Sequence, residues 1–140
     1  MSTARLDLAK ALCRFAHEGQ TDKAGAPYYL HPFAVADKVE REDEKIVAYL
    51  HDVVEDSNIG IDTIIDLFGP KVAEAVVSVT RREGEAYMDF VRRATQNPIG
   101  HKVKLADLEH NMDTSRLPEI TPKDRERLEK YRAAVEFLQE

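Results

Sequence analysis

Apolar residues recur at the three- and four-residue spacing of an α-helix along almost the whole chain, and this periodicity narrows the folds open to it. The pattern is clearest in three runs: Leu6, Leu8, Leu12 and Phe15; Ile46, Leu50, Val53 and Val54; Val72, Ala75, Val76 and Val79. Sustained alternation of apolar and polar residues, which marks a half-buried strand, is hard to find. The sequence therefore predicts an all-α fold.

Glycine and proline cluster at the breaks between these periodic segments, which fall at residues 19–27, 58–60, 69–70, 84, 97–98 and 117–122. The breaks divide the chain into about seven or eight helices, joined mostly by short connections. Residues 19–30 form a longer loop, and loops of this length in a compact domain are often functional. The last helix should begin with Thr121 as its cap and Pro122 in its first turn, and run to near Leu138.

Composition limits the size and partners of the molecule. A chain of 140 residues, 43% of them hydrophobic, suits a single compact domain over residues 1–140 with no room for a second catalytic module. The formal net charge of −6 argues against a broad nucleic-acid interface, so an anionic ligand needs locally placed Lys or Arg.

The sequence also favours a cytoplasmic protein without a membrane partner. No apolar stretch approaches the roughly 20 residues that a membrane-spanning helix needs. The single cysteine, Cys13, lies in an apolar run that is typical of a small buried residue. The sequence carries no signal for an oligomeric state.

Four polar residues interrupt the apolar segment that begins at Ile46: His51, Asp52, Glu55 and Asp56. On one continuous helix they would share an arc of about 140°, with the apolar side chains opposite. An imidazole and a carboxylate from neighbouring positions suit a borderline divalent metal such as Mn, Fe or Zn. Two ligands do not close a site, however, and a His-Asp pair is common by chance.

Two further residues could complete such a site, although each has a simpler interpretation. His31 opens a helix beside Pro32, where its ring could point inward or remain a capping or exposed histidine. Asp107 shares a helical face with Lys104 and Asn111, where it could bind a metal or form a solvated ion pair with Lys104. The individual residues leave these alternatives open.

Short motifs, in order along nearly the whole chain, resemble the HD hydrolase domain of RelA/SpoT-type alarmone enzymes. The motifs are AHEGQ (16–20), PYYLHP (27–32), HDVVED (51–56), FGPKVAEAV (68–76), VTRREGEAY (79–87), KLADLEHN (104–111) and KYRAAVEFL (130–138). In its length the chain is similar to the small stand-alone alarmone hydrolases. The resemblance implies one compact helical bundle of the HD superfamily.

The resemblance also implies a metal-dependent reaction. One divalent metal, usually Mn, is implied to have four ligands: His31, His51, Asp52 and Asp107. Glu55 and Asp56 are implied to act on the attacking water and on the leaving group. The implied reaction removes pyrophosphate from the 3′ position of guanosine tetraphosphate or pentaphosphate and leaves GDP or GTP.

Further residues are candidate contacts to the phosphorylated nucleotide. The resemblance implies this role for Lys23, Asn111 and Tyr131, which could instead be a solvated loop charge, a helix-end cap and a half-buried core residue. Arg81 and Arg82 could supply positive charge near a pyrophosphate, or form a solvated pair at a helix end.

Two histidines have similar alternatives. His17, within AHEGQ, could orient a metal ligand, because such ligands need hydrogen-bonded partners. Exposure or core packing is an equally good interpretation, and the same holds for His110.

Asp22 departs from the family pattern, because alarmone hydrolases commonly have an arginine at this loop position that packs against the guanine base. An aspartate cannot stack as a guanidinium does, and its charge repels phosphate. Two other functions therefore stand beside the alarmone hydrolase. One is an HD phosphohydrolase for another nucleotide, such as an adenine alarmone or a nucleoside phosphate. The other is a metal-retaining nucleotide sensor without turnover.

Overall fold

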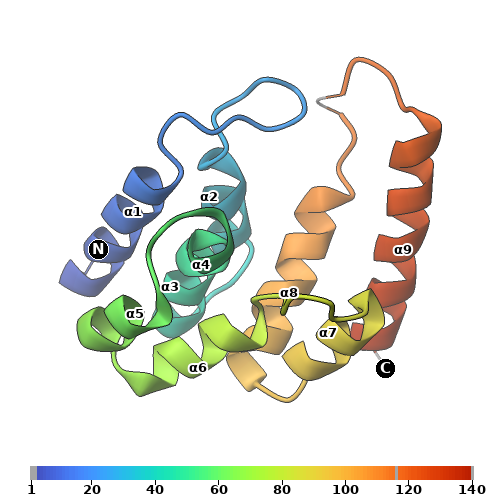
Figure 1. Cartoon of the computed structure of the whole chain (residues 1–140). Coiled ribbons are helices and arrows are strands. Elements are labelled where there is room, and N and C mark those ends of the chain that lie inside the picture. The colour runs from blue at the N-terminus through green and yellow to red at the C-terminus, as the bar shows by residue number, and fades with distance from the viewer. Residues whose placement is uncertain (1–2, 116, 140) are drawn as a thin grey trace.

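The computed structural model describes residues 3–115 and 117–139, and in these residues the chain forms nine α-helices (Figure 1). The helices are α1 (Ala4–Ala16), α2 (Leu30–Asp37), α3 (Glu42–Leu50), α4 (Val53–Asp56), α5 (Ile61–Phe68), α6 (Pro70–Ser78), α7 (Tyr87–Ala94), α8 (Pro98–Asn111) and α9 (Pro122–Gln139). The only β-type pairing within the described ranges is one isolated bridge between Thr21 and Pro27. The predicted all-α fold is confirmed.

The helices outnumber the predicted seven or eight because the segment through His51 and Asp52 is not one continuous helix. α3 ends at Leu50, and the four-residue α4 begins only at Val53. Asp52 has φ −105° and ψ −2°, away from regular helical values. The expectation that four polar side chains share one helical face is therefore wrong. His51 and Asp52 lie instead at the junction between two helices.

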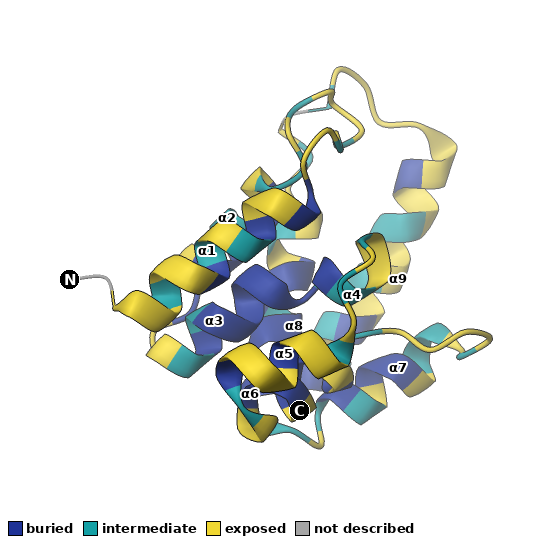
Figure 2. Cartoon of the chain, turned by 60° about the vertical axis from the view of Figure 1, so that its left-hand side comes forward, coloured by how far each residue is buried: buried dark blue, intermediate teal, exposed yellow. Residues whose placement is uncertain are grey.

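α3 lies at the centre of the fold, in contact with α1, α2, α6 and α8. Ile46, Val47 and Leu50 are fully buried, and Figure 2 shows this part of α3 enclosed by helices whose outer faces are exposed. Burial of one such side chain stabilises the fold by about 1.5 to 3 kcal/mol. Because the buried turn leads directly into His51, the apolar packing of α3 carries that histidine into the interior.

α8 and α9 form the second half of the structure (Figure 1). α8 packs on α2 and α3 with one face and on α9 with another. A smaller core joins α7, α8 and α9, and it consists of Val91, Leu108, Ala134 and Leu138. This arrangement brings Asp107 on α8 toward the α3–α4 junction.

α9 begins as the sequence predicts. The Thr121 hydroxyl accepts a hydrogen bond from the N–H of Asp124 at 3.2 Å, and the N–H of Thr121 donates to the Asp124 carboxylate at 3.0 Å. These reciprocal bonds satisfy N–H groups at the start of the helix. No helix in the described part of the chain is long and apolar enough to cross a membrane.

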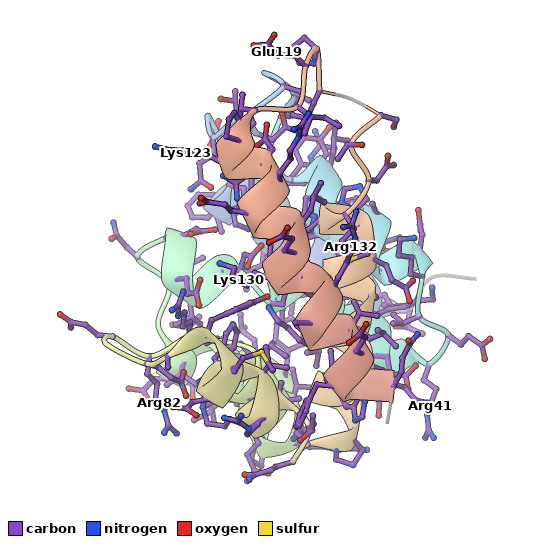
Figure 3. All side chains as sticks on the ribbon, turned by 90° about the vertical axis from the view of Figure 1, so that its right-hand side faces the viewer. Arg41, Arg82, Glu119, Lys123, Lys130 and Arg132 are labelled. Atoms are coloured by element: carbon purple, nitrogen blue, oxygen red, sulfur yellow. The ribbon has the colours of Figure 1, made fainter. Side chains whose placement is uncertain are left out.

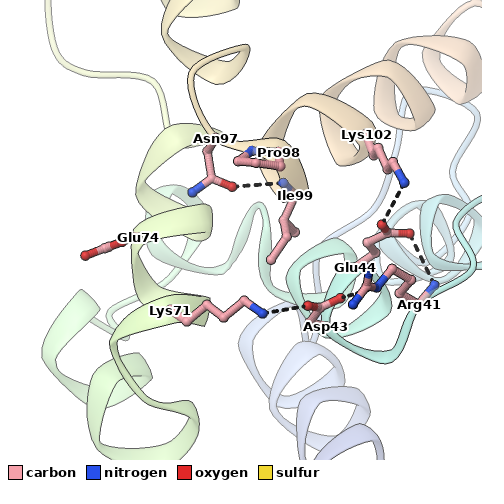
Figure 4. Close-up of a pocket in the computed structure, with 9 residues that line it drawn as sticks. All are labelled: Arg41, Asp43, Glu44, Lys71, Glu74, Asn97, Pro98, Ile99 and Lys102. Atoms are coloured by element: carbon pink, nitrogen blue, oxygen red, sulfur yellow. Dashed lines mark hydrogen bonds and ion pairs between the residues drawn. The ribbon is translucent and has the colours of Figure 1, made fainter.

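A hollow of about 330 Å³ beside the N-terminal end of α3 is lined by charges that already pair with one another (Figure 4). Lys71 Nζ lies 3.2 Å from Asp43 Oδ2, and Lys102 Nζ lies 3.2 Å from Glu44 Oε2. Glu44 is buried and also accepts the N–H of Arg41 at 3.2 Å. These contacts fix the start of the central helix.

Replacing Glu44 with alanine should lower the free energy of unfolding by about 1 to 2 kcal/mol, because the first turn of α3 loses its acceptor. Burial opposes ionisation of Glu44, but the N–H of Arg41 and the Lys102 ammonium hold its pKa below the usual 4.5. The stabilisation is therefore complete above pH 4.5 and is lost as pH falls through the lowered pKa. Urea denaturation at several pH values measures this difference.

Glu74→Ala is the matched control, since Glu74 lines the same hollow but is exposed and forms no ion pair with another described residue. We expect its free energy of unfolding to stay within about 0.5 kcal/mol of wild type. Equal losses in the two variants would contradict the structural role assigned to Glu44.

Candidate metal centre

Four side chains meet at the α3–α4 junction: His31 from α2, His51 and Asp52 from the junction itself, and Asp107 from α8. Asp107 Oδ1 lies 2.8 Å from His31 Nε2 and 3.3 Å from His51 Nε2. Asp52 Oδ2 lies 3.2 Å from His51 Nε2. Each of the four side chains is at most 16% exposed.

Three of these residues, His31, His51 and Asp52, place one ligand atom each within 4.8 Å of the others and form a possible metal site. Asp107 falls outside that group, but its Oδ1 contacts both imidazoles. The structure thus brings together all four residues that the sequence motifs single out. Two imidazoles and two carboxylates suit a borderline divalent metal.

Hydrogen bonds orient the histidine rings for such a role. His51 Nδ1 lies 2.6 Å from the carbonyl oxygen of Ala48, which can only accept, so this nitrogen carries a proton. Nε2 therefore faces the carboxylates as the nitrogen left for a metal. His31 Nδ1 similarly lies 2.7 Å from His110 Nδ1. A metal-binding histidine needs its second nitrogen held in this way, so these residues fit a divalent metal ion.

The carboxylates remain ionised although they are buried. Burial opposes ionisation of Asp52, but the positive charge that the His51 ring carries without a metal, with a smaller contribution from His31, lowers its pKa to about 2. Burial also opposes ionisation of Asp107, and the Lys104 ammonium with the two imidazoles holds its pKa well below the usual range. Two buried negative charges at neutral pH favour a cation between them and the rings.

Tyr28 supports the centre, and sequence reasoning missed it. Its hydroxyl donates to Asp52 Oδ2 at 2.6 Å, and its ring lies 4.9 Å from the ring of His17. The available signal was a hydroxyl-bearing aromatic residue shortly before His31 in PYYLHP.

His17 is buried and contacts the centre only through other residues. Its Nδ1 lies 2.9 Å from Gln20 Oε1, and its Nε2 has no hydrogen-bond partner among the described residues. The His17 ring packs on Tyr28, so it supports the hydroxyl that holds Asp52.

Glu55 and Asp56 lie on α4, a few residues after the candidate metal ligands His51 and Asp52. Glu55 lines the same hollow as His51 and Asp52, and its carboxylate accepts the N–H of Arg81. Burial and the negative charges of Asp52 and Asp56 raise the pKa of Glu55, which suits a proton acceptor. Asp56 has a pKa raised by burial and by Asp52, but it does not line this hollow.

The cluster opens into two adjoining hollows that share Asn111 and Tyr131. The smaller, of about 190 Å³, contains His51, Asp52 and Glu55 together with basic and aromatic side chains: Arg81, Lys104, Lys130, Tyr87 and Tyr131. The larger, of about 340 Å³, is lined by Lys23, Tyr28 and Arg127 among others. We refer to these two adjoining hollows together as the cleft, and the candidate metal centre lies in the smaller one.

The predicted substrate contacts divide between these hollows. Asn111 and Tyr131 line both, and Asn111 Nδ2 donates to Asp107 Oδ1 at 3.2 Å. Lys23 lines the larger hollow. Arg81 lines the smaller hollow, whereas Arg82 lines neither and lies on the α6–α7 connection (Figure 3).

The 19–30 loop is held by its own side chains and by α9. Asp22 Oδ1 accepts the N–H groups of Ala24 and Ala26 at 2.9 and 3.0 Å. Lys23 Nζ donates to Asp124 Oδ1 at 3.1 Å and so ties the loop to the start of α9. These contacts place Asp22 at the wall of the larger hollow as a loop-building residue.

The structure combines an all-helical fold with a buried cluster of histidine and aspartate side chains. Comparisons with known proteins agree with this description. A family model described as the HD domain matches residues 9–106. The chain therefore belongs to the HD domain family.

Curated proteins that are similar in sequence show which members of the family this chain resembles. The chain is 34% identical over 139 residues to the bifunctional (p)ppGpp synthase/hydrolase SpoT of Escherichia coli K12, covering 89% of this chain and 20% of that protein. It is 36% identical over 118 residues to guanosine-3′,5′-bis(diphosphate) 3′-pyrophosphohydrolase of Vibrio cholerae, covering 74% of this chain and 17% of that protein. The chain thus spans about a fifth of the length of these relatives.

A solved structure shares the fold. It is described as a metazoan ortholog of SpoT that hydrolyses ppGpp, and it matches with a TM-score of 0.80 at 24% identity, covering 99% of this chain and 86% of that one. This similarity confirms the predicted HD-type helical bundle.

Tyr28→Phe should weaken metal binding about ten-fold, because the variant keeps the ring but removes the hydroxyl that holds Asp52. Calorimetric titration with Mn²⁺ measures the affinity. Tyr29→Phe is the control, since the Tyr29 ring packs on Phe33 and no hydrogen bond among the described residues joins its hydroxyl to His31, His51, Asp52 or Asp107. Equal affinities in the two variants would show that the hydroxyl does not orient Asp52.

Proposed function

We propose that residues 1–140 act as one HD-type phosphohydrolase domain that hydrolyses the 3′-pyrophosphate of guanosine tetraphosphate or pentaphosphate in the cytoplasm. The observation that carries this proposal is the buried His-Asp cluster beside Glu55, at one end of a cleft with basic and aromatic walls. The names of the relatives as (p)ppGpp hydrolases support the choice of substrate.

The proposed cofactor is a single divalent metal, Mn²⁺, with four ligands: His31, His51, Asp52 and Asp107. Such an ion lowers the pKa of a water molecule and offsets negative charge on a phosphoryl oxygen. The protein orients these ligands by hydrogen bonds. Ala48 contacts the His51 ring, His110 contacts the His31 ring, and Tyr28 donates to Asp52.

Glu55 and Asp56 are the proposed proton-transfer groups. Glu55 accepts a proton as a water oxygen attacks the phosphorus atom bonded to the ribose 3′ oxygen. The bond between this phosphorus and the 3′ oxygen breaks, and Asp56 returns a proton to the 3′ oxygen. One water is consumed, and GDP or GTP leaves with pyrophosphate.

The proposed contacts to the nucleotide come from three elements. Asn111 and Tyr131 lie where the two hollows meet, which suits the ribose between the reacting phosphate and the base. Lys23 is proposed to bind the nucleotide in the larger hollow, in exchange for its ion pair with Asp124.

The base preference has a second candidate, because Asp22 lines the hollow that would receive the base. A carboxylate there cannot stack on guanine as an arginine does. An adenine alarmone is therefore the alternative substrate, processed by the same metal chemistry.

Pyrophosphate release with and without Mn²⁺ tests the proposal, with guanosine tetraphosphate and its adenine counterpart as substrates. We expect release that depends on metal and favours the guanine nucleotide. Release from the adenine compound alone would select the alternative. Tight binding without turnover of either nucleotide would overturn the hydrolase and leave a sensor.

Two variants should separate metal binding from proton transfer. Asp52→Ala should lose the metal, because it removes one of the two carboxylates that face the imidazoles. Glu55→Gln should keep the metal but lower kcat by about 100-fold or more, because the amide cannot accept a proton. Metal content after dialysis and initial rates measure both effects. Equal metal loss in the two variants would contradict the assigned roles.

A further inference from the structure

Lys130 on α9 lies in the smaller hollow, beside the candidate metal centre (Figure 3). Its side chain extends from α9 toward α7, where Nζ lies 4.3 Å from the centroid of the Tyr87 ring. The centroid of Tyr131 is 5.7 Å from the same nitrogen. Two aromatic faces thus hold the ammonium group in place without neutralising its charge.

No carboxylate in the described part of the chain forms an ion pair with Lys130, whereas the neighbouring cations have partners. Lys104 Nζ lies 3.1 Å from Asp107 Oδ2, and Arg127 lies 3.5 Å from Asp124. The chain has 26 acidic and 20 basic residues, so acidic partners are not scarce. A lysine that remains unpaired on the wall of a hollow is therefore available to an external anion.

Like charges surround this ammonium group. Partial burial and the positive charges of Arg81, Arg127 and Lys104 lower the pKa of Lys130. An ammonium group that has other cations near it and no carboxylate partner of its own is stabilised when a negatively charged ligand binds. Bound phosphate oxygens would remove the repulsion and accept hydrogen bonds from the ammonium group.

We propose that Lys130 binds the pyrophosphate leaving group, with its ammonium on the terminal phosphate. The identity of this anion rests on the proposed function, but the cation cluster does not. Lys130 shares its hollow with His51, Asp52 and Glu55, so its partner is the reacting pyrophosphate. The rest of the nucleotide lies beyond Asn111 and Tyr131, in the larger hollow.

Titration with inorganic pyrophosphate tests the role of Lys130 directly. Lys130→Met keeps an unbranched side chain that is one atom shorter, and it removes the charge. We expect its affinity for pyrophosphate to fall about ten-fold or more, because a hydrogen bond between charged groups is lost. Lys130→Arg should retain most of the affinity. The titration is done both without metal and with saturating Mn²⁺, because pyrophosphate itself binds Mn²⁺.

Lys123→Met is the matched control, since Lys123 is an exposed lysine on the same helix and lines neither hollow (Figure 3). We expect it to bind pyrophosphate as the wild type does. Equal affinities in Lys130→Met and Lys123→Met would overturn the inference, and so would a wild type that binds no pyrophosphate in either titration.

The outcomes also separate this inference from the proposed function. Pyrophosphate binding that depends on Lys130, without hydrolysis of guanosine tetraphosphate, would support the anion site and reject the proposed substrate. Hydrolysis of guanosine tetraphosphate with unchanged pyrophosphate binding in Lys130→Met would support the function and reject the site.

Discussion

The contact of Asp107 with both imidazoles is the interaction on which the rest of the site depends. One carboxylate oxygen joins α8 to His31 at the start of α2 and to His51 after α3. A buried charge of this kind is costly unless it is paired and hydrogen-bonded. Here Lys104 and Asn111 complete its contacts from the same helix. The packing of α2, α3 and α8 in this arrangement therefore supplies the partners that this carboxylate needs.

The sequence was sufficient to predict the helical class and to single out residues that lie together in the structure. Apolar periodicity predicts helices, and the ordered motifs single out the four residues that the structure places together. It did not predict the break between α3 and α4. Val53 and Val54 continue the apolar spacing of α3, so the pattern contains no stop at His51. The break coincides with a local contact between His51 and Ala48 and with a long-range one, the hydrogen bond from Tyr28 to Asp52, and the helical pattern indicates neither.

The sequence also does not predict which residues far apart in the chain contact one another. Lys23 and Asp124 are 101 positions apart, and neither residue by itself indicates the other as its partner. The sequence indicates Asp22 only as a departure from the family arginine, and it does not show that Oδ1 of Asp22 accepts two N–H groups of its own loop. The sequence does not single out Lys130, because a lysine on a polar helix is usually solvated. Its importance depends on the ring of Tyr87, which belongs to another helix.

Lys104 joins the two chemically different parts of the cleft. Its ammonium pairs with Asp107 at 3.1 Å and lies 4.4 Å from the centroid of the Phe90 ring. The same charge lowers the pKa of Asp107 and contributes to the lowered pKa of Lys130. Carboxylates suited to a cation and ammonium groups suited to an anion thus lie side by side in one hollow. A metal ion is complementary to the carboxylates, and a pyrophosphate is complementary to the ammonium groups. The metal ion reduces the repulsion between the carboxylates and pyrophosphate, and pyrophosphate reduces the repulsion between the ammonium groups and the metal ion. Binding of the two is therefore expected to be cooperative, because the ligands attract each other and because each neutralises the charges nearest to it.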